Sequence, residues 1–475
     1  MLKTDLPDAG VDELRALITG KQISPVDLMC RTLERIERLQ PTLNAFITVC
    51  AESAMAQARE AEAAVMRGDV LGPLHGIPFT VKDNIATEGM RTTYGSRIFE
   101  HNVPQRDAVA VTRAKAAGAL LVGKTTTPEF AFLGMTEAPL FGRTANAWRQ
   151  DRTSGGSSGG AATATAAGLG VLAICTDAGG SARIPAACNG VVGFKPSAGM
   201  VPHDWAEDVF ANTQYVTPMG RSVLDTAELM NVIAGPHASD PQTLGREVPD
   251  FAKAVRDGGD LRGIRLGWRP LLGNHVLANA VLSACEAALL HARTLGAEIL
   301  ESRELFENQE PLISRINASA RRAQYSHHLV RHRDIMCPKL VRQLEQVADL
   351  SAQDLWEGMF ERTRLFHQVQ GWFEHFDVLA TPTLARTALP IDHDFFKPID
   401  IDGQATDTPR RAWYPYTIPF NATGHPALSI PCGLDPEGLP IGLQLVGRIG
   451  SDAQLLRVGA LVAQASGFIG RPAGG

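Results

Sequence analysis

The chain has 475 residues, of which 44% are hydrophobic and 20% are charged, and its formal net charge is −6. This composition is ordinary for a globular protein, and the acidic balance disfavours a nucleic-acid partner. No run of about 18 apolar residues predicts a membrane-spanning helix, and the N-terminus lacks the apolar core of a secretory signal. Seven dispersed cysteines favour reduced thiols over a disulfide framework. We therefore expect a cytoplasmic protein with a large core and no membrane partner.

Residues 1–70 are predicted to form a helical segment. Ser24 and Pro25 are typical of an N-cap followed by a first-turn proline, and apolar residues follow them at helical spacing. Residues 50–67 are rich in alanine, which favours a second long helix. Glycine and proline at 72–76 then end the helical pattern.

Residues 71–235 have a different pattern. Short apolar runs alternate with glycine-rich turns and helical stretches, which is typical of an α/β fold with a buried sheet. The predicted strands are residues 77–81, 119–123, 171–175 and 191–194. Residues 222–234 are predicted to form a covering helix.

Residues 236–375 begin with a polar loop that ends near residue 263 and become mostly helical after residue 305, which predicts an inserted cap. The α/β pattern resumes in residues 376–475. The elements predicted after the loop are strand 264–268, helix 277–295, strand 298–300, strands 377–381, 427–431 and 441–447, and helix 452–466. We expect all segments to form a single large α/β/α domain with a central mixed β-sheet covered by helices.

The densest chemical signal lies in residues 153–184, where two glycine-rich turns, GGSSGG and DAGGS, flank a predicted helix and strand. Glycines before a serine let consecutive backbone N–H groups turn toward one point. Such a nest would hold an oxyanion while Ser181 attacks a carbonyl. A flexible linker is the alternative for GGSSGG, and an ordinary loop with a surface serine is the alternative for DAGGS.

Lys82 directly follows a short predicted strand in GIPFTVKDN. If the surrounding loops bury it, desolvation disfavours the ammonium form, and a neutral lysine serves as a general base. The alternative is a solvated surface lysine.

The ordered set of these motifs resembles the amidase signature family. The resemblance is carried by the stretches GIPFTVKDNI (76–85), GKTTTPEFAF (123–132), LFGRTANAW (140–148), SGGSSGG (154–160), TDAGGSARIPA (176–186), GFKPSAG (193–199), TPMGRSVLDTAELMNVIAG (217–235) and GHPALSIPCG…GLPIGLQLVG (424–447). It covers most of the chain except about 240–370, which is variable in that family. The implied fold is the amidase signature fold.

The resemblance also implies roles for individual residues. Ser181 would be the nucleophile, Ser157 the bridging serine after a cis peptide bond, and Lys82 the base. The backbone N–H groups that would hold the oxyanion belong to Ala178, Gly179, Gly180 and Ser181. Asp177 and Arg183 would brace the loop, and Ala131 would touch the substrate. No cofactor and no metal are implied, and a homodimer is the family habit.

The leading functional hypothesis is an amidohydrolase that cleaves small aliphatic or aromatic amides, or anilides, to a carboxylate and ammonia or an amine. The alternative is the glutaminase, or A, subunit of a tRNA-dependent amidotransferase complex. Residues 240–370, however, show no clear match to the tyrosine- and arginine-bearing glutamine segment of that subunit. A minor alternative is a serine esterase of the α/β-hydrolase type, because GGSSG matches G-x-S-x-G and is followed by Asp377 and His425 in chain order.

The predicted cap contains three groups of side chains. Arginines mixed with histidine and apolar residues are interpreted as a solvated helix face, namely Arg321, Arg322, Arg331 and Arg333. Aromatic residues at helical spacing favour a place in the core over the substrate pocket, namely Trp356, Phe360, Phe366 and Trp372. The histidines at 327, 328 and 332 have no carboxylate to complete a set, which favours a surface helix over a metal site.

Overall fold

An eleven-stranded mixed sheet organises the chain. The structure is a computed structural model that describes residues 6–302, 304–468 and 472. The strand order is β1-β3-β2-β6-β8-β7-β14-β15-β11-β9-β10. Their bounds are β1 Phe46–Val49, β2 Pro78–Lys82, β3 Leu120–Thr125, β6 Leu172–Asp177, β7 Val192–Lys195, β8 Tyr215–Gly220, β9 Arg265–Trp268, β10 Glu298–Glu301, β11 Val378–Pro382, β14 Ala427–Leu434 and β15 Pro440–Gly447. The predicted α/β fold with a central mixed sheet is confirmed.

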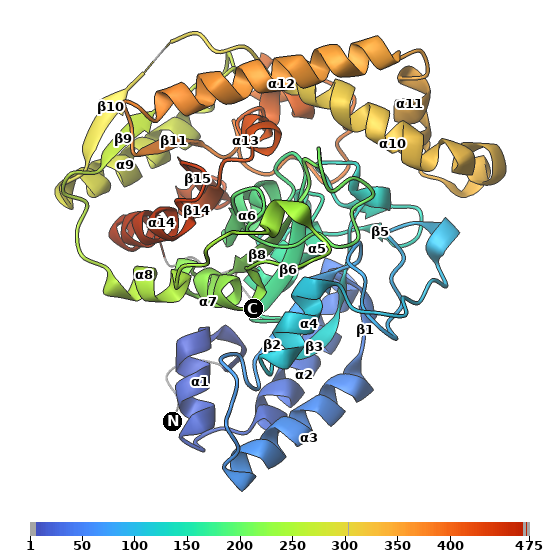
Figure 1. Cartoon of the computed structure of the whole chain (residues 1–475), viewed down its shortest axis with the longest axis vertical. Coiled ribbons are helices and arrows are strands. Elements are labelled where there is room, and N and C mark those ends of the chain that lie inside the picture. Colours follow the sequence, from blue (N-terminus) through green and yellow to red (C-terminus); the bar gives the residue numbers. More distant parts are fainter. Residues whose placement is uncertain (1–5, 303, 469–471, 473–475) are drawn as a thin grey trace.

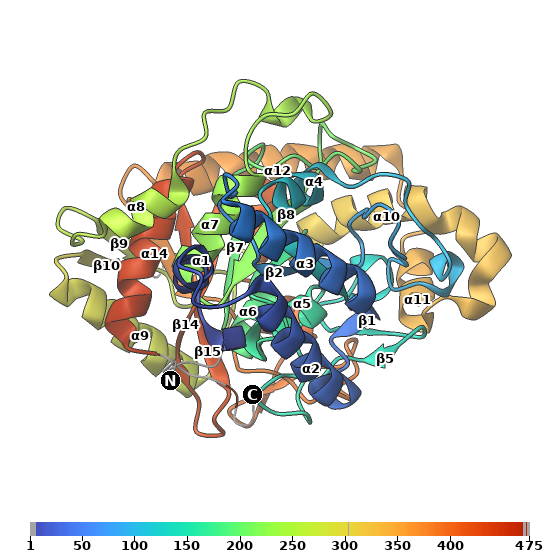
Figure 2. The ribbon, with the colours of Figure 1, turned by 90° about the horizontal axis from the view of Figure 1, so that it is seen from below.

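Helices cover this sheet (Figures 1 and 2). Their bounds are α1 Val11–Thr19, α2 Pro25–Leu43, α3 Ala51–Arg67, α4 Val109–Ala116, α5 Gly159–Ala166, α6 Arg183–Asn189, α7 Val223–Ile233, α8 Phe251–Asp257, α9 Asn279–Thr294, α10 Glu310–His332, α11 Pro338–Gln346, α12 Ala352–Trp372, α13 Ile418–Thr423 and α14 Asp452–Ser466. Figure 1 places α1–α3 at one end of the molecule and α10–α12 at the opposite end. Two small hairpins lie outside the sheet, β4 Glu137–Ala138 with β5 Gly142–Arg143 and β12 Asp400–Ile401 with β13 Gln404–Ala405.

The first seventy residues are not wholly helical, contrary to the prediction. Residues Phe46–Val49 form the edge strand β1, which pairs antiparallel with β3. The strand has only four residues between two long helices, so its short β-branched run carries little pattern. Strand β8 was also not predicted. It lies between β6 and β7, and proline and glycine interrupt its sequence.

Strand pairing brings the glycine-rich turns and Lys82 to one edge of the sheet. Strands β2 and β6 pair in parallel, with Val81 opposite Ile174. The carboxyl ends of parallel neighbours face the same side, and that side is where open α/β sheets hold their ligands. Lys82 ends β2 and Asp177 ends β6, so both reach this edge.

Helix α5 begins within the first glycine-rich turn and is buried along its whole length. A Cβ added at Gly160 would collide with Thr126 and with the carbonyl of Ala45. Glycine therefore allows α5 to pack directly on the backbone of its neighbours.

We predict that Gly160→Ala lowers the free energy of unfolding by about 1–3 kcal/mol, because overpacking forces the backbone to shift. The matched control is Gly371→Ala in α12, where an added Cβ meets no atom within 4 Å. That change should be neutral or stabilising by up to about 1 kcal/mol, because alanine favours a helix over glycine. Denaturant unfolding of both variants measures the difference, and equal stabilities would contradict the packing argument.

No helix in the described part of the chain is long and apolar enough to span a membrane.

Candidate active site

Lys82 lies at the carboxyl end of β2 and is fully buried. Its Nζ donates to Ser157 Oγ at 2.7 Å and to Thr176 Oγ1 at 2.9 Å. Burial lowers the pKa of Lys82 to about 7, although the Asp177 carboxylate opposes this shift. A large share of Lys82 is therefore neutral near neutral pH, and a neutral amine accepts a proton.

Ser157 lies in the turn that precedes α5, and the peptide bond between Gly156 and Ser157 is cis, as expected. A backbone hydrogen bond of 3.1 Å from Ser158 N to Ser181 O joins this turn to the second one. In the described structure, no hydrogen bond connects the side chains of Ser157 and Ser181. Lys82 and Ser157 are thus in direct contact, whereas Ser181 is held beside them through the backbone.

The second turn was expected to supply four N–H donors to an oxyanion. The N–H of Gly180 instead donates to Asp177 Oδ1 at 2.6 Å, so it points away from the substrate side. No hydrogen bond between described residues occupies the N–H of Gly179 or of Ser181, which leaves these two groups available to an oxyanion. The carbonyl of Gly179 accepts from Thr417 Oγ1 at 2.7 Å, which fixes the orientation of its peptide unit.

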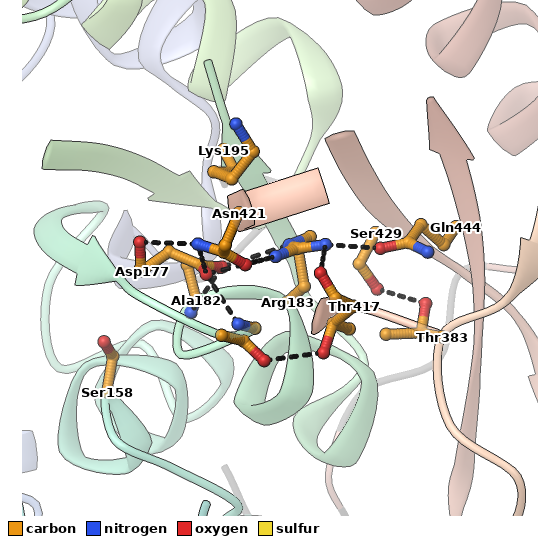
Figure 3. Close-up of polar contacts among 12 residues, drawn as sticks. Ser158, Asp177, Ala182, Arg183, Lys195, Thr383, Thr417, Asn421, Ser429 and Gln444 are labelled. Carbon is orange, nitrogen blue, oxygen red and sulfur yellow. Dashed lines mark hydrogen bonds and ion pairs between the residues drawn. The ribbon is translucent and has the colours of Figure 1, made fainter. Parts of the chain in front are cut away.

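Asp177 and Arg183 form a fully buried ion pair next to the second turn (Figure 3). Arg183 Nε and Nη2 each lie 3.1 Å from a carboxylate oxygen of Asp177, which is the bidentate geometry typical of strong Arg–carboxylate pairs. Burial opposes ionisation of Asp177, but Arg183 and the hydrogen bonds outweigh it and hold the pKa of Asp177 well below its usual range. The carboxylate also accepts from the N–H of Ala182 at 3.1 Å. The pair therefore joins the Asp177 side chain to the backbone N–H groups of Gly180 and Ala182 in the turn.

Residues distant in sequence complete this network. Asn421 Nδ2 donates to Asp177 Oδ1 at 2.9 Å. Arg183 Nη1 donates to the carbonyl of Thr417 at 3.0 Å and to Gln444 Oε1 at 2.6 Å. Helix α13 and strand β15 thereby support the turn that carries Ser181.

A small cavity of about 50 Å³ opens onto Ser181. Its lining includes Ala131 together with Ala178 and Gly179. The other lining residues are Phe132, Leu133, Gly134, Ile184, Ile313, Ser314, Asn317, Arg321, Arg410, Tyr414 and Ile418. Ser181 therefore lies on the wall of a cavity that residues from several distant segments enclose.

Sequence comparison agrees with this arrangement over nearly the whole chain. A sequence model of the family described as Amidase matches residues 27–456. The chain belongs to the amidase family. An acylamidase from Rhodococcus erythropolis is 33% identical over 462 residues, covering 97% of this chain and 96% of the relative. Family membership makes the protein a hydrolase that acts on the carbon–nitrogen bonds of amides.

Two further relatives of this amidase have different described functions. The A subunit of the glutamyl-tRNA(Gln) amidotransferase of Thermosynechococcus vestitus is 35% identical, covering 94% of this chain and 96% of that relative. The crystal structure of a bacterial aryl acylamidase of the amidase signature family superimposes with a TM-score of 0.90 at 30% identity, covering 97% of this chain and 96% of the other.

The interpretation of the arginine cluster as a solvated helix face is wrong for Arg321. Arg321 lines the cavity beside Ser181, whereas Arg331 and Arg333 are exposed. The aromatic residues of the cap also differ in burial. Trp372 is buried, whereas Trp356 and Phe360 are exposed and do not lie in the core. Helical spacing identifies a shared face, but it does not reveal which neighbour covers that face.

The amidase does not assemble the residues of the esterase alternative. Asp377 pairs with Arg265 at 3.1 Å, away from the glycine-rich turns. His425 is buried between Thr423 Oγ1 at 2.8 Å and Gln370 Oε1 at 3.0 Å, so neither ring nitrogen contacts a serine. Among the described residues, no group of three His, Cys, Asp or Glu side chains could hold a metal ion.

Three residues that shape the site of the amidase were not predicted. Thr176 contacts Lys82, and its only signal in the sequence is its place directly before DAGGS. Asn421 and Arg410 come from the segment before β14, which lacked any recognised motif in the sequence. Their side chains reach the turn and the cavity only through the tertiary fold.

Proposed function

We propose that this amidase is a stand-alone amidohydrolase that cleaves small carboxamides through a Ser181–Ser157–Lys82 triad. The observation that carries the proposal is the 2.7 Å contact between Lys82 Nζ and Ser157 Oγ, combined with the burial that lowers the pKa of Lys82 to about 7. The similarity to an acylamidase and to an aryl acylamidase supports small amides and anilides as substrates.

The first half-reaction forms an acyl-enzyme. Ser181 Oγ attacks the amide carbonyl while its proton passes to Ser157 Oγ, and the Ser157 proton passes to neutral Lys82. The negative charge that develops on the carbonyl oxygen is held by the N–H groups of Gly179 and Ser181. Lys82 then returns a proton through Ser157 to the nitrogen, the carbon–nitrogen bond breaks, and ammonia or an amine leaves.

The second half-reaction hydrolyses the acyl-enzyme. Water takes the place of the amine, and its proton moves through Ser157 toward Lys82 as it attacks the ester carbonyl. The carbon–oxygen bond to Ser181 breaks, Ser181 regains a proton, and the carboxylic acid departs.

The protonation state of Lys82 should set the pH dependence of the first half-reaction. The reactive form is neutral, so kcat/KM should fall about tenfold per pH unit below pH 7 and level off above it. A pH profile on an amide without an ionisable group measures this. A rate that stays constant from well below to well above pH 7 would contradict Lys82 as the base.

The proposed function is tested by ammonia or amine release from a panel that includes aliphatic amides, an anilide and glutamine. Turnover by the parent chain alone, with large losses in Lys82→Ala and Ser157→Ala, is the expected outcome. The matched control is Ser429→Ala, which removes an equally buried hydroxyl that contacts Thr383 Oγ1 and not the site. No turnover of any amide by a folded chain would contradict a stand-alone hydrolase.

A second candidate function is that of the A subunit in a glutamyl-tRNA(Gln) amidotransferase, favoured by relatives of that description at 35% identity over 94% of this chain. This function requires partner subunits and glutamine as the amide donor. Co-purification with other subunits, together with glutamine as the preferred amide, would support it. A homodimer in size-exclusion chromatography is expected for the stand-alone hydrolase.

A further inference from the structure

Two arginines face the cavity beside Ser181. Arg321 lies on α10, and Arg410 lies shortly before α13. Both are only partly exposed. Burial lowers the pKa of Arg321 to about 10, and the positive charge of Arg410 adds to this shift. The two guanidinium groups therefore repel each other inside a small cavity.

Neither guanidinium forms an ion pair with a carboxylate among the described residues. Arg321 Nη1 donates to Gln343 Oε1 at 3.2 Å. Arg410 donates to Ser314 Oγ at 3.2 Å and to the carbonyl of Phe132 at 3.3 Å. At Arg321 this neutral acceptor does not offset the burial that lowers its pKa, because a charged group out of water requires an opposite charge.

Within the described structure, Glu310 is linked to Arg410 only through Ser314, whose Oγ accepts from Arg410 and donates to Glu310. Glu310 accepts from Arg411 Nε at 3.1 Å and from the hydroxyl of Ser314. Burial opposes the charged form of Arg410, but Tyr414 and the charge of Glu310 outweigh it and raise the pKa of Arg410, without an ion pair to Glu310. The described cavity lining itself contains no aspartate or glutamate. The cavity therefore carries two positive charges on its wall, and the charge of Glu310, which lies outside the lining, acts on Arg410 and not on Arg321.

We propose that Arg321 and Arg410 bind a carboxylate carried by the acyl half of the substrate, so that monoamides of short dicarboxylic acids are preferred substrates. This inference rests on the proposed amide hydrolysis at Ser181. Paired guanidinium groups suit a carboxylate, whose two oxygens accept several N–H donors at once.

The cavity fits such an acyl group in size and lining. A single water occupies about 10–15 Å³ on the same scale, so about 50 Å³ admits only a few heavy atoms. Ile184, Ile313 and Ile418 line it as well and offer contacts for methylene groups. In the proposed mechanism the amine leaves first, so the enclosed space suits the group that stays bound to Ser181.

The same chemistry disfavours glutamine. Glutamine carries an ammonium beside its carboxylate, and the described lining offers no acid to neutralise that ammonium. Arg321 and Arg410 would repel it instead. A carboxylate without a neighbouring ammonium, as in succinamate, is the better match.

The test compares succinamate with 4-methylpentanamide, in which a branched alkyl end replaces the carboxylate. We expect succinamate to have a kcat/KM at least about tenfold higher. Arg321→Met should lower kcat/KM for succinamate by about 10- to 100-fold and leave that for 4-methylpentanamide within about threefold. Arg321→Lys should recover part of the loss. The control is Arg315→Met on the same helix, whose guanidinium pairs with Glu361.

Equal kcat/KM values for the two amides, or an Arg321→Met variant that slows both equally, would overturn the carboxylate site while amide hydrolysis stands. If neither amide is turned over, binding to Ser181→Ala by calorimetry decides the matter. Succinamate that binds Ser181→Ala and no longer binds the Ser181→Ala, Arg321→Met double variant supports the site. Failure of succinamate to bind Ser181→Ala would overturn it.

Discussion

Replacing Ser181 with alanine is expected to lower kcat for amide hydrolysis by about 10⁴- to 10⁶-fold. In the proposed mechanism the loss is large because Ser181 Oγ forms the ester bond of the acyl-enzyme, and no other described residue that lines the cavity could replace it as a nucleophile in the same position. The N–H groups of Gly179 and Ser181 remain in the variant, so substrate binding should change little. Steady-state kinetics together with a binding measurement separate these two effects.

Ser429→Ala is the control for this prediction, because Ser429 is buried in β14 and its hydroxyl forms a hydrogen bond with Thr383 Oγ1. Its activity should stay within a few-fold of the parent. A Ser181→Ala variant that retains more than about one hundredth of the parent kcat would show that Ser181 is not the nucleophile.

Arg183→Met is expected to lower the free energy of unfolding by about 3–5 kcal/mol. Arg183 and Asp177 are both fully buried, and removal of the guanidinium leaves a carboxylate without its ion-pair partner. Asp177 would then take up a proton or draw in water, and either change disturbs its hydrogen bonds to the N–H groups of Gly180 and Ala182. Denaturant unfolding measures the stability, and activity should fall with it because the turn carries Ser181.

A surface pair provides the contrast. Arg149 pairs with Asp151 at 2.9 Å, and both side chains are substantially exposed. Arg149→Met should cost less than about 1 kcal/mol, because water screens such pairs. Adding Asp177→Asn to Arg183→Met should recover part of the stability, since no unpaired buried charge remains. If Arg183→Met were no more destabilising than Arg149→Met, the bracing role would be contradicted.

The sequence predicted the elements that carry strong local patterns. Strand 77–81 is observed as Pro78–Lys82, and strand 171–175 as Leu172–Asp177. The N-cap at Ser24 is observed as well, with its side chain accepting from Val26 N. These elements are predicted correctly because apolar periodicity and capping residues are properties of short stretches of chain.

What the sequence did not predict depends on contacts between distant segments. Arg321 lies on a polar helix whose pattern favours solvent, and only the packing of α10 beside the second glycine-rich turn directs it into the cavity. The N–H of Gly180 belongs to a motif that predicts an oxyanion donor, yet the Asp177 side chain captures it. Short-range patterns do not indicate which of two nearby acceptors a backbone N–H will choose.

The central claim is that Ser181, activated through Ser157 and Lys82, forms the acyl-enzyme. The most direct measurement is labelling of the whole protein with a fluorophosphonate, followed by peptide mass spectrometry, in the parent and in Lys82→Ala. The reagent loses fluoride as its phosphorus bonds to an activated serine oxygen. We predict one label on Ser181 and a strongly reduced labelling rate in Lys82→Ala. A label on Ser157 or on another serine, or no label on a chain that hydrolyses amides, would contradict the account.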